Sequence, residues 1–425
     1  MATLGIDFGS SYTTVSWINP KHGRPETVKF NGDGSAKYPS VIMGAESGLI
    51  LGYQALNYLE GVYQIPDETK RFEALANFIP SLKRILAPDG IELIGDQEYS
   101  HNHLLTTFFS ELKDLSTKHC GSTVNFDSAV ISHPVDFPSS LINMLIEALH
   151  SAGFANVQTQ LEPIAAVLGY SNDHEIKNDE GILVFDFGGG TIDVAYVKKR
   201  FNHLKILCEP KCDMKCGGQD IDILLYKDLK KKIEAQFNIN ISSSGMIDYG
   251  ILNSCRRLKE LFSGPNNSYN IPILIAHDRK IITFDYKLNR ESFENIIYQK
   301  VTDAINVASL VVEQTRQKGY EINKVLLIGG SSQLTLIHKL LANILPNASI
   351  DTCGEKDIAV ALGNITEELT VLEDNRNGDN KEKDINEDRT TEKKCDNKNT
   401  PLEASKTLGD VVYIHNDDGK LQFNW

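Results

Sequence analysis

The chain has 425 residues, 41% of them hydrophobic, and a formal net charge of −14 at pH 7. A chain of this length can bury more than one hydrophobic core, so two or three domains are expected. No apolar run approaches the length of a membrane-spanning helix, about 18 residues. The negative charge argues against nucleic-acid binding through the general surface, which needs clustered Lys and Arg. We therefore expect no membrane contact and no direct nucleic-acid contact.

The first predicted element is a strand pair in "LGIDFGSSYTTVSWI", within a region over residues 1–57 that is expected to alternate strands and turns. The first strand ends at Asp7, and a turn with Gly9 and several hydroxyl groups precedes the second. This turn begins within ten residues of Met1, so no signal peptide is expected. The seven cysteines are odd in number and favour reduced thiols over a disulfide framework. The sequence thus predicts a cytoplasmic protein.

The next part of the chain predicts helices around one buried strand. Residues 101–119 carry apolar side chains at helical spacing. "DSAVISHPVDF" predicts a buried strand that ends at Pro134. A helix with Ser139 or Ser140 as its N-cap is expected to follow and to stop at Gly153. "LEPIAAVLGY" opens another helix, and this alternation of strands with helices indicates the α/β class.

The stretch "ILVFDFGGGTIDVAYV", residues 182–197, combines two acids with three glycines. Glycines let a backbone approach a phosphate closely and point its N–H groups at the phosphate oxygens. Asp186 and Asp193 would repel that phosphate unless a divalent cation lay between them, so the pair implies Mg²⁺, which prefers oxygen ligands and water. For this stretch alone, the alternative is a plain hairpin with solvated acids and with glycines at positive φ.

The two strand pairs share one pattern. Asp7 and Val15 stand at the same interval as Asp186 and Val194, and a glycine follows each aspartate by two residues. A repeat of this kind predicts two related lobes, each of which offers an aspartate and a hairpin turn to a shared cleft.

A third glycine turn follows the predicted strand 325–328 in "KVLLIGGSSQL". A strand, a Gly-Gly pair and a helix suit nucleoside binding. The sequence has no G-x-x-x-x-G-K-[ST] motif, and no G-x-G-x-x-G follows a strand. The P-loop and Rossmann folds therefore lose their main support.

Two other clusters have structural explanations. The basic run "KDLKKKIEA", residues 227–235, has apolar residues at helical spacing, so its lysines are expected on a solvated helix face. Cys208, Cys212 and Cys216 are equally spaced, but their spacing fits no zinc motif. Packing of small residues is the favoured interpretation for these thiols.

The end of the chain changes in composition. Residues from about 366 to 401 are rich in charge and Asn and almost free of apolar side chains, which predicts a disordered linker. The final stretch "VVYIHNDDGKLQFNW" has two strand-like runs around an Asp-Gly pair, which predicts a β hairpin.

Eight motifs, in this order along the chain, resemble the nucleotide-binding domain of the heat shock protein 70 chaperones, within the actin and sugar-kinase superfamily. They are "GIDFGSSYTTV", "LKRIL", "ISHPVDF", "LEPIAAVLGY", "VFDFGGGTIDV", "CGGQDID", "IGGSSQL" and "DIAVALG". The resemblance covers residues 3 to about 368 and implies an α/β, two-lobed actin-like ATPase fold with duplicated ribonuclease-H-like lobes. It implies lobe I over residues 1–180, lobe II over 181–365, a disordered acidic linker over 366–400 and a short β tail over 401–425.

The resemblance also implies an activity, hydrolysis of ATP to ADP and phosphate, with Mg²⁺ and, as a further candidate ion, K⁺. Lys83 matches the lysine that positions the attacking water, while Glu162 and Pro134 match the pair that links nucleotide state to lobe movement. The catalytic set that the resemblance implies is Asp7, Lys83, Glu162, Asp186, Thr191 and Asp193, with the three aspartates holding Mg²⁺ mostly through water. The matching positions around the nucleotide are Gly9, Ser10, Ser11, Tyr12, Gly188, Gly189, Gly190, Gly217, Gly218, Lys259, Ser263, Gly329, Gly330, Ser331 and Asp357.

Some positions depart from the family's pattern. Arg256 and Glu260 stand where the family has a glutamate and an arginine near adenine, so a carboxylate replaces the guanidinium that normally stacks on the base. Gln219 replaces a usual acid, and Gln333 replaces a usual arginine. Neither a leucine-rich interdomain linker nor a complete peptide-binding domain is expected.

Two functions remain open from the sequence. One is an ATP-binding, slowly hydrolysing chaperone that assists protein folding with a J-protein cochaperone, a nucleotide exchange factor and unfolded clients. The other is a non-hydrolysing regulatory relative that pairs with a J-protein at the ribosome. A sugar kinase or a filament-forming actin relative would share the fold, but it has no reason to keep "ISHPVDF", Lys83 and the helix of "LEPIAAVLGY" together.

Overall fold

The computed structural model describes most of the chain before residue 367 and three short segments after it. The described ranges are 2–30, 34–65, 67–121, 123–201, 203–241, 249–277, 280–352, 358–366, 406–408, 411–415 and 421–424. The linker expected over 366–400 lies outside them, except for Thr366. In the tail, strands β20 (Lys406–Leu408), β21 (Val411–His415) and β22 (Leu421–Asn424) pair antiparallel in one sheet, and the turn expected between the last two lies outside the described residues.

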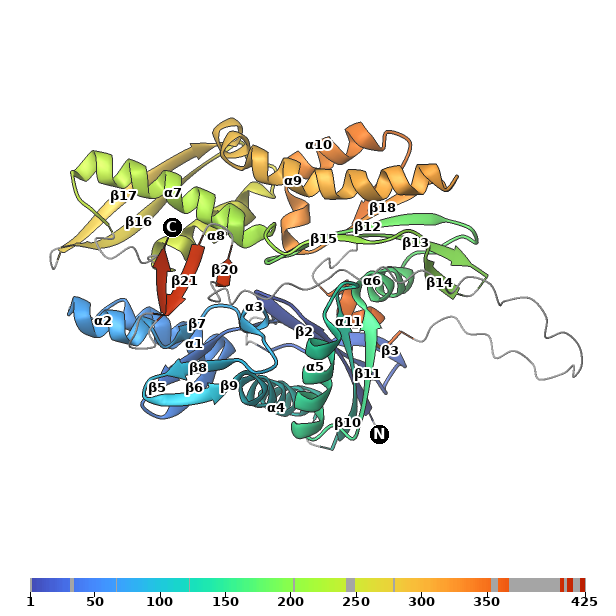
Figure 1. The fold of residues 1–425 in the computed structure, drawn as a ribbon, viewed down its shortest axis with the longest axis horizontal. Helices are drawn as coiled ribbons and strands as arrows, with labels where there is room; N and C mark the ends of the chain where they lie inside the picture. The colour runs from blue at the N-terminus through green and yellow to red at the C-terminus, as the bar shows by residue number, and fades with distance from the viewer. Residues whose placement is uncertain are drawn as a thin grey trace, which may run out of the picture.

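Two six-stranded sheets with the same strand order form the frame of the molecule (Figure 1). The first has the order β11-β10-β1-β2-β3, with β4 also paired to β2; the second has the order β19-β18-β12-β13-β14, with β15 also paired to β13. The bounds in the first sheet are β1 (Ala2–Phe8), β2 (Tyr12–Asn19), β3 (Arg24–Thr27), β4 (Lys37–Pro39), β10 (Phe126–His133) and β11 (Asn156–Leu161). Those in the second are β12 (Gly181–Phe187), β13 (Ile192–Arg200), β14 (His203–Ile206), β15 (Lys211–Asp213), β18 (Lys324–Ile328) and β19 (Ser349–Thr352).

The directions of the strands repeat as well as their order. In each sheet the first hairpin is antiparallel, and its leading strand pairs in parallel with a strand that comes much later in the chain. The register places Asp7 opposite Thr14 in one hairpin and Asp186 opposite Asp193 in the other. The predicted repeat of strand, turn and strand is therefore present, and the mixed α/β class is confirmed.

Helices α4 (His101–Cys120) and α5 (Ser139–Ser151) belong to the hydrophobic core of the first sheet. The helix predicted over 101–119 is confirmed, and its apolar stripe is buried. The N-cap prediction for α5 is wrong. Pro138 occupies the N-cap and its carbonyl accepts hydrogen bonds from the N–H groups of Leu141 and Ile142, so Ser139 and Ser140 are already helical residues.

The first half also contains smaller elements between β4 and α4. Helix α3, only four residues long, follows Ser81 and carries Lys83 and Arg84. The elements here are β5 (Ile42–Ala45), β6 (Gly48–Leu51), α1 (Gly52–Val62), α2 (Glu68–Leu75), β7 (Phe78–Ile79), α3 (Leu82–Ile85), β8 (Ile91–Ile94) and β9 (Gln97–Ser100).

A larger hydrophobic core joins the second sheet to four helices and a long two-stranded ribbon. The basic run of residues 227–235 lies on α7, where Leu225, Leu229 and Ile233 are buried and Lys227 and Lys231 are exposed, as predicted. The elements are α7 (Gly218–Phe237), α8 (Tyr249–Phe262), β16 (Ser268–His277), β17 (Lys280–Asn289), α9 (Arg290–Gln317), the 3₁₀ turn η1 (Gly330–Gln333) and α10 (Thr335–Ile344).

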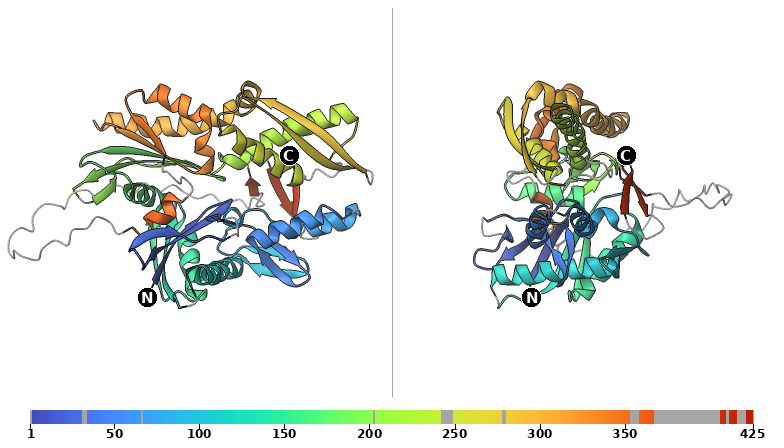
Figure 2. Two further views of the ribbon diagram at one scale, coloured as in Figure 1. Left: turned by 180° about the vertical axis from the view of Figure 1, so that it is seen from behind. Right: turned by 90° about the vertical axis from the view of Figure 1, so that its left-hand side faces the viewer.

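Helices α6 (Glu162–Ser171) and α11 (Ala359–Gly363) pack on each other between the two sheets (Figures 1 and 2). Glycine makes this close approach possible, because a Cβ at Gly169 would collide with the Ala359 carbonyl and one at Gly363 with the Ala165 carbonyl. Residues of α6 and α11 share a core with β12, β13 and β18, while α11 also contacts β1, β2 and β3. This helix pair therefore joins the two halves.

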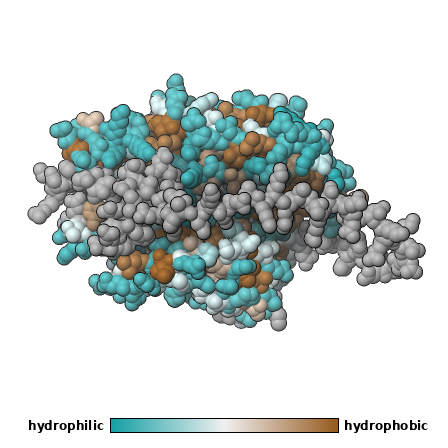
Figure 3. Space-filling view, viewed as in Figure 1, coloured by the Kyte–Doolittle hydropathy of each residue, from teal (hydrophilic) through white to brown (hydrophobic). Residues whose placement is uncertain are grey.

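The surface is mixed in character. In the view of Figure 3, hydrophobic residues form scattered groups among hydrophilic ones. None of the described helices combines the length and the apolar character needed to span a bilayer.

Candidate functional site

A cavity of about 360 Å³ opens between the two sheets, at the end where both hairpin turns lie. The turn after β1, the turn after β12 and the turn after β18 all contribute to its wall. Of the predicted site residues, Asp7, Gly9, Ser10, Ser11, Tyr12, Lys83, Glu162, Asp186, Gly188, Gly189, Gly190, Thr191, Lys259, Ser263, Gly329, Gly330 and Ser331 line it. The structure thus brings together residues from all three glycine turns.

The turn 188–190 is held firmly by its own backbone atoms. The N–H of Gly188 donates to the Thr191 carbonyl at 3.1 Å, so it closes the turn and does not face a ligand as the sequence had suggested. The carbonyls of Gly188 and Gly189 accept from N–H groups at the start of α7, at 2.9 and 2.8 Å. The N–H groups of Gly189 and Gly190 have no hydrogen-bond partner in the described part of the chain. These two amides are the ones left to bind an anion.

The three predicted metal-holding acids differ in position. Asp7 and Asp186 line the main cavity, whereas Asp193 lines a smaller cavity behind it, together with Asp186 and Glu162. The Thr191 hydroxyl donates to Oδ2 of Asp193 at 2.8 Å.

The electrostatics of these acids favour a cation. Loss of hydration raises the pKa of Asp186 well above its ordinary value, and the carboxylates of Glu162, Asp193 and Asp7 act in the same direction. Loss of hydration and the Glu162 carboxylate likewise raise the pKa of Asp193. Within the described ranges no three His, Cys, Asp or Glu side chains lie close enough to ligate one ion directly. That Mg²⁺ is held mostly through water stays a prediction.

Lys83 faces these acids from the first half. Its Nζ donates to Oε1 of Glu162 at 3.0 Å, and the two side chains are 15% and 9% exposed. Burial by itself lowers the pKa of Lys83, but the carboxylates of Glu162 and Asp7 outweigh it and raise that pKa overall. Lys83 therefore stays protonated at neutral pH and presents a fixed positive charge to the cavity.

Glu162 reaches this pair because of where α6 begins. It is the first residue of the helix and Pro163 follows it, an arrangement that suits the first turn, where a backbone N–H has no helical partner. A carboxylate at a helix N-terminus is also favoured by the helix dipole.

The other end of the cavity is lined by α8 and the turn after β18. Nζ of Lys259 donates to the Gly218 carbonyl at 2.8 Å and lies 2.8 Å from Oδ1 of Asp222, whose side chain is 1% exposed. Nε of Arg256 lies 3.5 Å from Oδ2 of the same Asp222. Glu260 lines the cavity one helical turn after Arg256, and it is exposed. The cation of Arg256, which Asp222 holds, therefore lies next to the exposed carboxylate of Glu260.

Some predicted residues lie outside the main cavity. Gly217 and Gly218 do not line it; they lie behind the turn 188–190, where added side chains would collide with that turn or with Ser331. Pro134 is buried just after β10 and does not line it either. Asp357 lies outside the described residues.

The requirement for glycine is clearest at Gly329. Its φ is +79°, and a Cβ there would lie 2.6 Å from the Phe187 carbonyl oxygen and 2.7 Å from Oδ1 of Asp186. Both its backbone conformation and its neighbours therefore exclude a side chain.

The sequence analysis missed three residues at this site. Thr14 is 3% exposed, lines the cavity, and its Oγ1 has no hydrogen-bond partner among the residues described. A buried hydroxyl of this kind, with the acids and glycine turns, fits a phosphate and its cation. The hairpin repeat could have revealed Thr14, because it stands seven residues after Asp7, as Asp193 stands after Asp186. Lys37 lines the cavity, and Arg84 adjoins Lys83; neither carries a sequence signal of its own.

Comparison with known proteins agrees with this geometry. The model of a family described as "Hsp70 protein" matches residues 3–386. The chaperone protein DnaK of Mycoplasma mobile is 28% identical over 364 residues, which cover 85% of this chain and 57% of that protein. The chaperone protein DnaK of Ureaplasma urealyticum is 27% identical over 366 residues, with the same coverage. The chain thus spans little more than half the length of these relatives.

Proposed function

The chain belongs to the Hsp70 protein family, and from this premise we propose that it binds ATP with Mg²⁺ in the cavity between the two sheets and hydrolyses it slowly to ADP and phosphate. Its relatives carry the name of a chaperone. We therefore propose a role in assisting protein folding.

The observation that supports hydrolysis best is the ion pair of Lys83 with Glu162, at 3.0 Å and largely buried, on the wall of the same cavity as Asp7 and Asp186. Phosphoryl transfer to water needs little covalent help from a protein; it depends on positioning and on neutralisation of charge. A lysine that stays protonated cannot accept the proton of the attacking water. Its proposed role is to position that water and to stabilise the negative charge that develops.

The remaining residues have proposed roles as binders. The N–H groups of Gly189 and Gly190 and the turn of Ser10, Ser11 and Tyr12 would bind phosphate oxygens from the two sides. Thr191 keeps Asp193 oriented by its 2.8 Å hydrogen bond. When bound, Mg²⁺ would neutralise phosphate charge beside the three acids, and K⁺ is a second candidate ion.

At the other end, Lys259, Ser263, Gly329, Gly330 and Ser331 would surround the nucleoside. These positions lie on α8 and on the turn after β18, on the far side of the cavity from Lys83. Gly217 and Gly218 would contribute indirectly, through their contacts with the turn 188–190 and with Ser331.

We also propose that the fold is the two-lobed actin-like ATPase fold, with lobe I over 1–180 and lobe II over 181–365. The proposal is supported by the two sheets, whose strands follow the same order and run in the same relative directions. The packing of α6 with α11 between the sheets suits movement of Glu162 with the lobes, so that Glu162 and Pro134 would link nucleotide state to lobe position.

A second candidate is a regulatory relative in which nucleotide is bound but not hydrolysed. The exposed carboxylate of Glu260 on the cavity wall favours this candidate, because it weakens the expected affinity for the base. In either case the proposed partners are a J-protein and a nucleotide exchange factor. Unfolded clients suit the first candidate and the ribosome the second.

Two measurements on the purified chain test the proposal. Calorimetry should show magnesium-dependent binding of ATP and ADP, and its absence would refute the proposed site. Single-turnover hydrolysis, with and without a J-protein, then separates the two candidates. Cleavage that the J-protein accelerates supports the chaperone ATPase, whereas binding without cleavage under both conditions supports the regulatory relative.

A further inference from the structure

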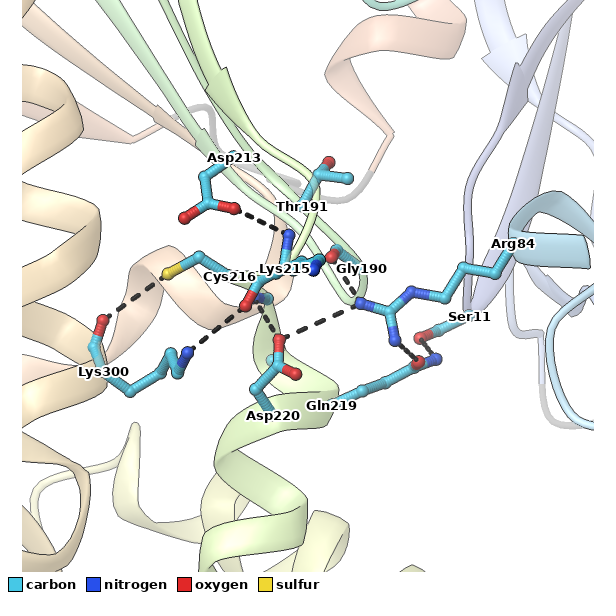
Figure 4. A network of polar contacts seen from close by, with 12 residues as sticks. Ser11, Arg84, Gly190, Thr191, Asp213, Lys215, Cys216, Gln219, Asp220 and Lys300 are labelled. Atoms are coloured by element: carbon cyan, nitrogen blue, oxygen red, sulfur yellow. Dashed lines mark hydrogen bonds and ion pairs between the residues drawn. The ribbon is translucent and has the colours of Figure 1, made fainter. Parts of the chain in front are cut away.

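Arg84 reaches across the cleft from the first half to the second (Figure 4). Its Nη1 donates to Oε1 of Gln219 at 2.8 Å, and its Nη2 donates to the Gly190 carbonyl at 2.5 Å. The same Nη2 lies 3.9 Å from Oδ2 of Asp220. The side chains of Arg84 and Asp220 are 8% and 7% exposed. One buried guanidinium on α3 thus holds three groups of the second half.

The groups that Arg84 holds are parts of the two phosphate turns or lie directly behind them. Gly190 ends the glycine turn of the second half, and a Cβ there would lie only 2.9 Å from Nε of Arg84. Nε2 of Gln219 donates to Oγ of Ser11, in the first turn, at 3.3 Å. Oδ2 of Asp220 accepts a backbone N–H at the start of α7 at 2.7 Å. The contact therefore ties both turns to one point.

Separation of the two halves would break these hydrogen bonds and would therefore cost free energy. Hydrogen bonds from a guanidinium are charge-assisted and stronger than bonds between neutral groups. Burial raises the pKa of Asp220, and Arg84 is the main group that opposes this rise. Without Arg84, the buried Gly190 carbonyl and the buried Asp220 carboxylate would each lose a positively charged partner.

We propose that Arg84, with Gly190, Gln219 and Asp220, forms a strap that holds the cleft closed over bound nucleotide and sets the rate at which nucleotide leaves. The inference rests on the proposed function, since it concerns nucleotide in that cavity. Arg84 acts here as a positioning residue. It does not line the cavity itself.

Gln219 makes the strap adjustable. A neutral amide oxygen accepts one bond from Arg84, whereas a carboxylate at this position would form an ion pair with it. The Ser11 hydroxyl, which now accepts from Gln219, can donate to a carboxylate instead. The single change Gln219→Glu is therefore expected to strengthen the strap.

Release of a fluorescent ADP analogue from the full chain in the presence of Mg²⁺, chased with unlabelled ATP, tests the strap. Arg84→Met should release the analogue about tenfold faster than the parent chain, because two charge-assisted hydrogen bonds are lost. Arg84→Lys should lie between the two, and Gln219→Glu should release it more slowly than the parent. The association rate should change much less than the release rate, because the strap forms only when the cleft is closed.

Lys339→Met is the matched control. Nζ of Lys339, on α10, lies 3.1 Å from Oε2 of Glu294 on α9, and both residues belong to the second half. Neither residue lines the cavity or contacts a member of the strap. Loss of this cation removes a similar charge away from the cleft, so the release rate should stay at the parent value.

Equal release rates from the parent, Arg84→Met and Gln219→Glu would overturn the strap. If Arg84→Met fails to fold, Gln219→Ala takes its place: it removes the acceptor of one Arg84 bond and should release the analogue faster than the parent, whereas Gln219→Glu should release it more slowly. A failure of the proposed function is distinguishable, because then the parent binds no nucleotide. In that case hydrogen exchange of the amides around Gly190 and Gln219, without nucleotide, should still be faster in Arg84→Met than in the parent, and equal exchange would overturn the strap.

Discussion

The hairpins β1–β2 and β12–β13 occupy equivalent places in the two sheets but differ in charge. Opposite Asp7 stands Thr14, and opposite Asp186 stands Asp193. The second turn has three glycines in a row, whereas the first has one glycine followed by two serines. The repeated frame thus offers two turns and one acid from each hairpin to one cavity, and the second hairpin adds Asp193 in the smaller cavity behind it.

The cations near the two hairpin turns have the opposite distribution. Lys83 and Arg84 come from α3, in the elements that the first half carries between β4 and α4 and that have no equivalent in the repeated frame. The second half places Lys259 and Arg256 at the far end of the cavity, on α8. The comparison teaches that the repeated strands set the place of the site and carry its acids, while helices outside the repeated frame supply the cations Lys83, Arg256 and Lys259.

The largest effect should follow removal of the charge of Lys83, which the first half places beside the acids. Lys83→Ala is expected to slow ATP hydrolysis about 10²-fold or more, by analogy with loss of one preorganised electrostatic contact, while ATP binding survives. Single-turnover kinetics and calorimetry measure the two quantities. Lys231→Ala, an exposed lysine on α7, is the control. Hydrolysis at the parent rate in Lys83→Ala would refute the assigned role.

A smaller effect should distinguish the two hairpins. Asp193→Asn removes the second acid of the second hairpin and should raise the Mg²⁺ concentration needed for half-maximal ATP binding about tenfold, since one unit of charge near the ion is lost. Thr14→Val, at the equivalent position of the first hairpin, should change it less than threefold, because a neutral hydroxyl is lost. A Mg²⁺ titration of ATP affinity measures both. Equal effects would show that the hairpins are equivalent after all.

The far end of the cavity should respond more weakly. Glu260→Arg should tighten ATP binding about threefold, because it replaces an exposed carboxylate with a cation able to stack on the base. Arg256→Ala should weaken binding by a similar factor. Calorimetry measures both affinities, and Glu147→Arg, an exposed site on α5, controls for net charge. No change in Glu260→Arg would remove the base-stacking explanation.

The smallest effect on nucleotide binding should come from the tail. Deletion of residues 401–425 is expected to leave ATP affinity unchanged while it weakens association with a J-protein or with ribosomes, since a two- or three-stranded ribbon of this size needs a partner surface. Calorimetry and co-sedimentation test the two parts. Loss of ATP binding would instead show that the tail is part of the folded core.

Much of the frame could be predicted from local patterns. Buried apolar runs correctly predicted the strands that lead to Asp7 and Asp186. Helical spacing predicted a helix over residues 101–119, and α4 ends only one residue later. Local rules were less successful at boundaries. The serines expected to cap α5 lie inside the helix because Pro138 precedes them and its carbonyl already accepts the first helical bonds.

The sequence by itself determined the two hairpins, the glycine turns and the acids beside them, because each depends on residues only a few positions apart. Only the tertiary structure decided that α6 packs on α11 and that Arg84 reaches Gln219 and Gly190. It also showed that the N–H of Gly188 donates to the Thr191 carbonyl within the turn. The physical reason is chain separation. Arg84 and Gln219 are 135 residues apart, so their contact depends on how the two sheets face each other, which no local periodicity records.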